Sequence, residues 1–335
     1  MKTPRTTDRT PAKNPAARPG DPGSRSWLGR HRGPGLIVLA LALVAAAWAG
    51  WRIFGPTQTH AIRHVVLISI DTCRADHLGC YGFHRATTPS IDAVAKDAAL
   101  FYRALTPVPM TTPAHSSMLT GAYPPTHGVR MNNGQRLGES SVTLATVLKQ
   151  AGFRTAAFVG GFPLDAQFGL NQGFETYDCQ FSRTSDRSKT VSERTADEVN
   201  RPALAWLEEN ARAGDGGKGF FLFLHYFDPH APYQPPKPYA ADFADDLYSG
   251  EIAYVDHCIG QVMDRLRAMG LYDNTLVIIT GDHGEGLGEH GEMAHAFYIY
   301  DSTLRVPLII RSPGGGGGAQ DPAAGAGREP AGRHG

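Results

Sequence analysis

The sequence predicts an α/β protein in which helices flank a mostly parallel central sheet. Two observations lead to this fold class. Apolar, β-branched runs of the kind that parallel sheets bury recur along the chain, and segments with helical periodicity separate them. The 335 residues are also enough to enclose the core that such a sheet requires. Because 32 basic side chains balance 32 acidic ones, the net charge does not indicate a nucleic-acid partner.

The N-terminal segment is expected to attach the protein to a membrane. Residues 1–34 carry eight lysines and arginines against two aspartates and are rich in Pro, Gly, Ser and Thr, which predicts a disordered arm in the cytoplasm. Residues 35–54 are almost entirely apolar and predict one transmembrane helix, followed by a linker over 55–62. The rest of the chain is then expected outside the cytoplasmic (inner) membrane. Since Ala47-Trp-Ala49 resembles a cleavage site, a cleaved signal peptide is the alternative.

The chain after the linker is predicted to alternate strands and helices in one domain, 63–311. The predicted strands are 64–70, 154–159, 220–224, 275–280 and 306–310. The predicted helices are 90–100, 111–121, 142–151, 191–212 and 251–269. The last 24 residues, 312–335, include 17 Gly, Ala and Pro residues and are expected to form a disordered tail.

A hydroxyl stands at the start of the helix predicted over 111–121. Pro113 fits the first helical turn, and Gly121 fits the C-terminal cap. The unpaired N–H groups and the dipole of such a helix favour an anion beside Thr111. The simpler alternative is that Thr111 or Thr112 is only an N-terminal cap.

Groups that bind metals or transfer protons follow three of the predicted strands. They are Asp71 after the first strand, His225, Asp228 and His230 after the third, and Asp282 with His283 after the fourth. Because ligands bind at the carboxyl ends of parallel strands, we expect these side chains to converge at one edge of the sheet. Carboxylates, imidazoles and a hydroxyl suit a divalent cation, which lowers the pKa of the Thr111 hydroxyl and makes it a nucleophile.

Five segments of the chain resemble, in the same order, the sulfatases of the alkaline phosphatase superfamily. They are 70–82, 111–121, 123–129, 225–233 and 280–285, within a likeness that extends over residues 63–311. The resemblance implies an alkaline phosphatase-like sandwich that cleaves sulfate or phosphate esters. It also implies that Asp71, Asp282 and His283 bind a divalent metal ion (Ca, Mn or Zn), with Thr111 completing the coordination.

The nucleophile is the first departure from that family. At the position of Thr111, many members carry a Cys or Ser that is oxidised to formylglycine, an aldehyde. The hydrate of that aldehyde expels sulfate without attack of water on sulfur. Because Thr carries a methyl group on its β-carbon, the same oxidation would give only a ketone. Unmodified Thr111 therefore favours phosphoryl or phosphonyl esters, although the sequence as a whole resembles sulfatases.

The second departure concerns the groups that transfer protons and bind the anion. His115 replaces the usual arginine, and residues 158–163 stand where a Lys-x-His element is expected. The candidate replacements are His225, His230 and His295. A loop or hydrogen-bonding role is the alternative for each of these histidines. We predict four catalytic residues: Thr111, His115, His225 and His295, the last as the acid that protonates the leaving group. Asp228 and His230 are the predicted substrate-binding residues.

The third departure is the tail. Family members continue into a C-terminal subdomain, which is expected to be missing here, as in a truncated or frame-shifted gene. The leading hypothesis is a membrane-anchored hydrolase of sulfate or phosphate esters. The alternatives are a phosphotransferase that acts on cell-envelope components and an inactive, truncated remnant.

Overall fold

The computed structural model describes residues 61–132, 134–181, 193–211 and 218–314, together with residues 38, 41–46 and 48. The chain divides into two units, Met1–Thr57 and Gln58–Gly335. The residues described in the first unit are helical and exposed. Among all described residues, no helix is both long enough and apolar enough to cross a membrane. The predicted basic arm, most of the predicted transmembrane segment and the predicted tail from residue 315 on lie outside the described residues.

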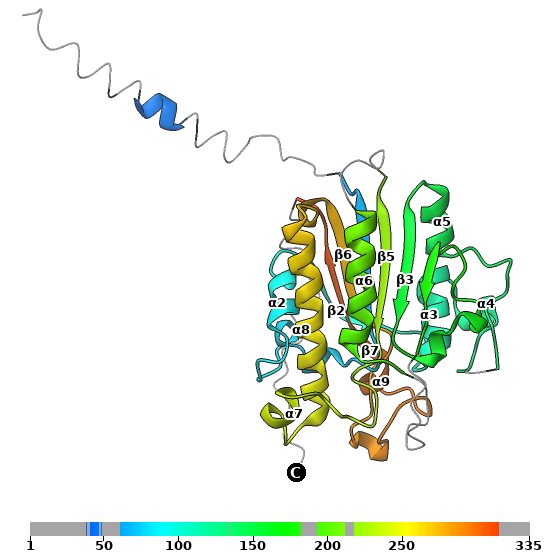
Figure 1. The fold of residues 1–335 in the computed structure, drawn as a ribbon. Coiled ribbons are helices and arrows are strands. Elements are labelled where there is room, and N and C mark those ends of the chain that lie inside the picture. The colour runs from blue at the N-terminus through cyan, green and yellow to red at the C-terminus, as the bar shows by residue number, and fades with distance from the viewer. Residues whose placement is uncertain are drawn as a thin grey trace, which may run out of the picture. The chain divides into compact units, whose positions relative to one another are not determined.

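The second unit is built on one seven-stranded mixed sheet (Figure 1), in the order β2-β7-β6-β1-β5-β3-β4. The strands are β1 (His64–Ile70), β2 (Ala99–Leu105), β3 (Arg154–Val159), β4 (Thr176–Asp178), β5 (Phe220–Tyr226), β6 (Thr275–Gly281) and β7 (Arg305–Arg311). β7 runs antiparallel to both of its neighbours, whereas every other pairing is parallel. The α/β fold with a mostly parallel sheet is therefore confirmed.

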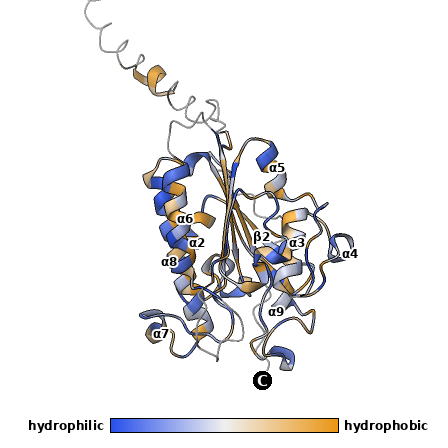
Figure 2. Cartoon of the chain, turned by 45° about the vertical axis from the view of Figure 1, so that its right-hand side comes forward, coloured by the Kyte–Doolittle hydropathy of each residue, from blue (hydrophilic) through white to orange (hydrophobic). Residues whose placement is uncertain are grey.

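Helices cover both faces of this sheet (Figure 2). The helices are α2 (Pro89–Ala95), α3 (Thr111–Thr120), α4 (Pro124–His127), α5 (Leu144–Gln150), α6 (Ala196–Asn210), α7 (Tyr239–Asp242), α8 (Leu247–Ala268) and α9 (Asp301–Leu304). Alternate residues of β1 enter opposite cores: Val66 and Ile68 pack with apolar residues of α2, α6 and α8, and Val65 and Leu67 with those of α3 and α5. β1 thus lies at the centre of the sheet and is buried along its whole length.

The sequence predictions fail mainly at the edges of the sheet. The helix predicted over 90–100 ends at Ala95, and Ala99–Leu105 is strand β2. β2 has a neighbour on one side only, alternates between partly buried and exposed residues, and carries the exposed Arg103, so it lacks the apolar run of a central strand. β4, the opposite edge, is only three residues long and was not predicted for the same reason. The helix predicted over 191–212 is α6, which begins later, at Ala196.

Candidate active site

Two neighbouring parallel strands bring the predicted metal ligands together. β1 and β6 pair in a register that sets Ile70 opposite Gly281, so the next residues, Asp71 and Asp282, emerge level with each other. Both carboxyl groups are buried, as is His283. The predicted convergence of Asp71, Asp282 and His283 at the carboxyl edge of the sheet is therefore observed.

Thr111 is the first residue of α3, and its side chain faces this cluster. Its Oγ1 lies 3.4 Å from Nε2 of His283. The N-cap residue is Met110, so the alternative in which Thr111 or Thr112 only caps the helix is wrong. The Thr112 hydroxyl donates instead to the carbonyl of Pro163, at 2.8 Å. Gly121 closes the helix with a left-handed φ of 67°, as predicted.

The first turn of α3 offers fewer free donors than the sequence predicts. The Thr112 amide donates to the side chain of Asn132 (2.8 Å), the Ala114 amide donates to the Met110 carbonyl (3.0 Å), and Pro113 has no N–H. These groups are therefore unavailable to an anion. An anionic substrate beside Thr111 needs another source of positive charge, and the buried cluster has the composition of a cation site.

The hydrogen bonds around His283 show that the cluster fits a divalent cation. Nδ1–H of His283 donates to the carbonyl of Gly284 (2.9 Å), so Nε2 is unprotonated and carries a free lone pair. Nε2 lies 3.4 Å from Oδ2 of Asp282 and 3.8 Å from Oδ1 of Asp71. Both oxygens are buried, and none of the described residues donates a hydrogen bond to them. Buried acceptors that face one another in this way are costly unless a cation lies between them.

The ionisation of these groups supports the same assignment. Burial and the neighbouring charge of Asp71 raise the pKa of Asp282 well above its ordinary value. Burial works in the same direction on Asp71, but the hydrogen bond from His225 and the nearby His283 outweigh it and lower the pKa of Asp71. Burial lowers the pKa of His283 to about 3, so its ring is neutral at pH 7 and free to ligate a metal. In the absence of a cation, ionising both carboxyl groups would cost considerable free energy.

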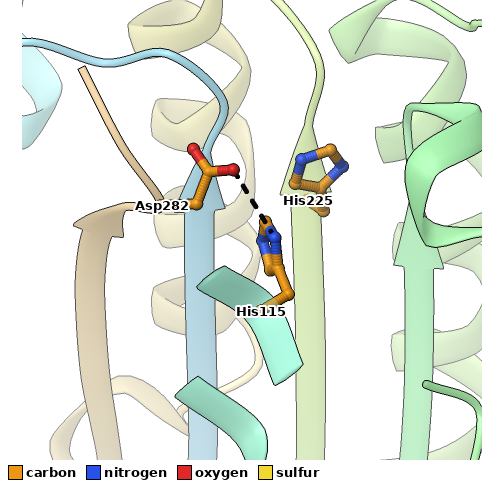
Figure 3. Close-up of side chains that lie close together, drawn as sticks. All are labelled: His115, His225 and Asp282. Carbon is orange, nitrogen blue, oxygen red and sulfur yellow. Dashed lines mark ion pairs between the residues drawn. The ribbon is translucent and has the colours of Figure 1, made fainter. Parts of the chain in front are cut away.

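His115 belongs to a second group of possible ligands, which Figure 3 shows with His225 and Asp282. Its Nδ1–H donates to the Thr111 carbonyl (2.8 Å) and lies 3.5 Å from Oδ2 of Asp282, and its Nε2 accepts from the Ser69 hydroxyl (2.9 Å). Burial, with the neighbouring His225, lowers the pKa of His115 to about 3. A neutral, fully buried ring with both nitrogens bonded cannot replace an anion-binding arginine. This geometry favours a positioning role beside Thr111 over the catalytic role predicted for His115.

His225 is also fully engaged by the protein. It is the residue of β5 that pairs with Ser69 of β1. Its Nδ1 accepts the amide of Gly160 (3.3 Å), and its Nε2–H donates to Oδ2 of Asp71 (3.2 Å). Because neither ring nitrogen is left for a substrate, this geometry favours the hydrogen-bonding alternative over catalysis: His225 orients Asp71.

His295 lies beside His283, in the loop before α9. The two rings are 4.4 Å apart between centroids, and Nδ1 of His295 donates to Oε1 of Glu285 at 3.0 Å. Burial opposes a charge on this ring, but the hydrogen bond and the charge of Glu285 raise the pKa of His295 above its ordinary value. Glu285 ends one of the five family-like segments, but no role was predicted for it from the sequence.

The two predicted substrate-binding residues both line a cavity of about 70 Å³ near the start of α6, together with Arg194. His230 also contacts the candidate site, because its ring stacks on Phe227 (4.4 Å between centroids) and meets the edge of His295 at 5.3 Å. Burial raises the pKa of Asp228 to about 7 against the opposing effect of backbone amides. The structure therefore does not bring Asp228 to the metal-ligand cluster.

A larger cavity of about 450 Å³ lies beside Asp282, between α3 and the strands β2, β6 and β7. Its lining includes Ala114, Met118, Val306 and Leu308 and contains no basic residue. An anion in this cavity would therefore depend on a cation at the Asp282 cluster for its charge partner.

Known proteins share this fold and these segments. The chain is structurally similar to the phosphonate monoester hydrolase of Agrobacterium radiobacter, with a TM-score of 0.61 and 22% identity over 75% of this chain and 68% of that one. It is 27% identical over 319 residues to YidJ, an uncharacterized sulfatase of Escherichia coli (strain K12). It is 25% identical over 292 residues to an ulvan-active sulfatase of Formosa agariphila. The two sequence matches include 75% of this chain but only 63% and 56% of those relatives.

These likenesses show that the protein shares its α/β fold with these proteins. Residues 63–325 match the sulfatase family, and the chain belongs to this family.

Proposed function

We propose that this protein is a membrane-anchored, metal-dependent hydrolase that cleaves sulfate or phosphate esters with Thr111 as the nucleophile. The observation that carries the proposal is the Thr111 hydroxyl, 3.4 Å from the Nε2 lone pair of His283 and beside two buried carboxyl groups. Membership of the sulfatase family supports ester hydrolysis. The apolar run over 35–54 and the basic residues before it support a membrane anchor, with the catalytic unit outside the cytoplasmic membrane.

Asp71, Asp282, His283 and Thr111 are the residues that would hold the metal ion. A bound Ca, Mn or Zn ion supplies the positive charge that lowers the pKa of the Thr111 hydroxyl and neutralises the ester anion. Thr111 Oγ1 then forms a bond to sulfur or phosphorus, the bond to the leaving oxygen breaks, and the hydroxyl proton passes to solvent. His295 donates a proton to the leaving oxygen. In the second step water attacks the Thr111 ester, a proton of that water returns to His295, and Oγ1 is released.

The choice between sulfur and phosphorus depends on the nucleophile. Thr111 cannot become formylglycine, so a sulfate monoester of Thr111 would have to be opened by water at sulfur. This requirement favours phosphate or phosphonate esters. Proteins similar to this chain include both an ulvan-active sulfatase and a phosphonate monoester hydrolase, so both ester classes need to be assayed.

The test is turnover by the full chain, loaded with Ca, Mn or Zn, of aryl sulfate, aryl phosphate and aryl phosphonate monoesters. We expect Thr111→Ala to lower kcat by about 10³-fold or more, because no hydroxyl remains to form the ester. Thr111→Ser keeps a hydroxyl and should retain measurable turnover. Thr112→Ala is the matched control, since that hydroxyl donates to the Pro163 carbonyl and to no other residue that the structure describes. A folded, metal-loaded protein that cleaves none of the three esters, or a Thr111→Ala variant as active as the wild type, would refute the proposal.

A phosphotransferase that acts on cell-envelope components is the second candidate. A Thr111 ester passes to an alcohol by the same chemistry that passes it to water. The same assay with added glycerol distinguishes them: a transferase places the anion on glycerol, whereas a hydrolase releases it as the inorganic ion.

A further inference from the structure

Glu285 is a buried carboxyl group that the proposed metal site does not use. Its side chain has no exposed surface. Oε1 accepts Nδ1–H of His295 at 3.0 Å, and Oε2 accepts the hydroxyl of Tyr233 at 3.2 Å. Both oxygens of Glu285 therefore accept hydrogen bonds from protein donors. In contrast, Oδ1 of Asp71 and Oδ2 of Asp282 accept none from the described residues. This arrangement suits a residue that holds another side chain, not a metal ligand.

The backbone around Glu285 is held as firmly as its side chain. The Glu285 amide donates to the Ser302 carbonyl (3.1 Å), and its carbonyl accepts from the Arg74 guanidinium (3.4 Å). The preceding Gly284 passes so close to α9 that a Cβ there would collide with the Ser302 carbonyl oxygen. A carboxylate on such a segment has little freedom to move, so it can define the position of the ring that it contacts.

His295 needs such support because it lies on a loop and not on a strand or helix. Its side chain is 12% exposed, and the following residue, Ala296, has a left-handed φ of 85°. The ring contacts His283 on one side and His230 on another. Since Nδ1 is committed to Glu285, Nε2 is the nitrogen that remains for a substrate.

We infer that Glu285 is a positioning residue, which Tyr233 holds in place and which fixes the ring of His295 so that Nε2 exchanges the proton with the substrate. The inference rests on the proposed function of the Thr111 site. In the first step Nε2–H gives its proton to the leaving oxygen as the bond from sulfur or phosphorus to that oxygen breaks. In the second step Nε2 takes a proton from the attacking water. Glu285 neither gains nor loses a proton; it holds the ring and its tautomer.

The test compares two leaving groups on the ester that the wild type cleaves. A 4-nitrophenolate departs without a proton, whereas a phenolate needs one. We expect His295→Ala to lower kcat/KM for the phenyl ester by about 10²-fold or more, and for the 4-nitrophenyl ester by far less. The readout is kcat/KM because it reports formation of the Thr111 ester, whereas hydrolysis of that ester is the same for both substrates. Glu285→Gln has the same shape without the charge, and should lower kcat/KM for the phenyl ester by roughly 10-fold with little effect on the 4-nitrophenyl ester. Tyr233→Phe should act in the same direction, but more weakly.

Glu292→Gln is the matched control, because Glu292 is another buried glutamate whose charge acts on His295 but which accepts from the Tyr298 amide and not from the ring. Equal losses on both esters in Glu285→Gln would indicate a merely structural role, and no loss would show that Glu285 does not act through His295. Either result overturns the inference. If the wild type cleaves neither ester, the proposed function fails instead.

A second measurement does not depend on turnover. Nitrogen-15 NMR of histidine-labelled, metal-free protein at alkaline pH reports which ring nitrogen carries the proton, and His295→Ala identifies the signal. We expect His295 to be protonated at Nδ1 in the wild type and in Glu292→Gln. In Glu285→Gln the amide of Gln can donate to Nδ1, so we expect a shift toward the Nε2–H tautomer. A His295 signal that is unchanged in Glu285→Gln would contradict the inference.

Discussion

Single residues of the site differ mainly in which of their polar atoms the protein leaves free. His115 and His225 have both ring nitrogens bonded to protein groups. His283 and His295 each commit Nδ1 and keep Nε2. The same side chain therefore has two uses here: the first pair supports the backbone and Asp71, and the second pair faces the reaction. Residue type alone does not distinguish these uses, because the partner on the far side of the ring decides them.

Thr72 shows that the backbone is also shaped for the site. It is a β-branched residue with a φ of 49°, in the left-handed region that such residues rarely adopt. This conformation directs its amide to Oδ1 of Asp282 (3.2 Å), while the Tyr248 hydroxyl donates to its carbonyl (2.7 Å). Strain at this position is consistent with a functional site, since surrounding hydrogen bonds are needed to maintain it.

His64 gives a prediction about acid sensitivity that is independent of the catalytic site. It begins β1, is buried, and stacks on Phe220 at 4.2 Å. Burial, followed by the charge of Arg63, lowers its pKa from 6.5 to about 4. A histidine with a lowered pKa stabilises the fold above pH 6.5, and this contribution is lost as the pH falls from 6.5 toward 4. The wild type should therefore lose about 2 kcal/mol of unfolding free energy through His64 between pH 7 and pH 5.

The measurement is urea unfolding of the wild type and His64→Phe at both pH values. Phe keeps the stacking but cannot take up a proton, so the variant should be less sensitive to acid by about 2 kcal/mol. His84→Phe, at an exposed position, is the control and should keep the sensitivity of the wild type. Equal acid sensitivity in wild type and His64→Phe would show that His64 is not neutral in the folded protein.

Elements of the fold show how far sequence reasoning reaches. The central strands β1, β5 and β6 were predicted to within two residues at each end, because they are apolar runs buried on both faces. The edge strands β2 and β4 were missed, because pairing with a neighbour far away in the sequence, not apolar content, makes them strands. Tertiary contacts thus override local periodicity at the edges of the sheet.

The candidate site also has a part that the sequence predicted and a part that it did not. Asp71, Thr111, Asp282 and His283 were predicted to converge because each stands at the end of a recognisable element, and the structure brings them together. The positioning roles were not predictable. His115 depends on Ser69, 46 residues away, and Glu285 depends on Tyr233, 52 residues away. Such pairs leave no periodic pattern in a single sequence.

The edge pair β2–β7 depends on one side chain outside both strands. Register shifts between Phe101 and Ala104, where an irregularity interrupts the ladder. The hydroxyl of Tyr81 accepts the Leu308 amide at 2.8 Å and lies 3.1 Å from the Phe101 and Leu308 carbonyls. We expect Tyr81→Phe to lower the free energy of unfolding by roughly 1–2 kcal/mol, because partly buried backbone groups lose their partner.

Chemical denaturation measures that loss, with Tyr102→Phe as the matched control. Tyr102 packs edge-on against Tyr81 at 5.7 Å, and its hydroxyl has no hydrogen bond to any residue that the structure describes. The control should therefore change stability by less than about 0.5 kcal/mol. If the two variants were equally stable, the Tyr81 hydroxyl would not hold the edge of the sheet.

At the scale of the whole catalytic unit, the fold buries charged groups at the centre of the sheet, which costs free energy of folding. β1 and β6 are interior strands with a neighbour on each side, and the residues that follow them carry two buried carboxyl groups, Asp71 and Asp282. A protein that only needed to be stable would bury apolar groups there. This cost is easiest to understand if a cation is part of the native state, since binding to the folded chain alone adds stability by mass action.

We therefore expect Asp282→Asn to be more stable than the wild type without metal, but to lose the stabilisation that metal gives the wild type. With a chelator, the variant should melt at a higher temperature than the wild type, because burial and Asp71 raise the pKa of Asp282 and folding must pay to protonate it. With Ca, Mn or Zn at about 100 times Kd, the wild type should gain roughly 3 kcal/mol, or about 5–10 °C, whereas the variant should gain little.

Thermal melts of both proteins, in chelator and in each metal, measure these differences in stability. Asp245→Asn, which removes an exposed partner of Arg85, should respond to metal as the wild type does. A wild type that none of the three metals stabilises would leave the buried carboxyl groups without a cation and would favour an inactive remnant over an enzyme.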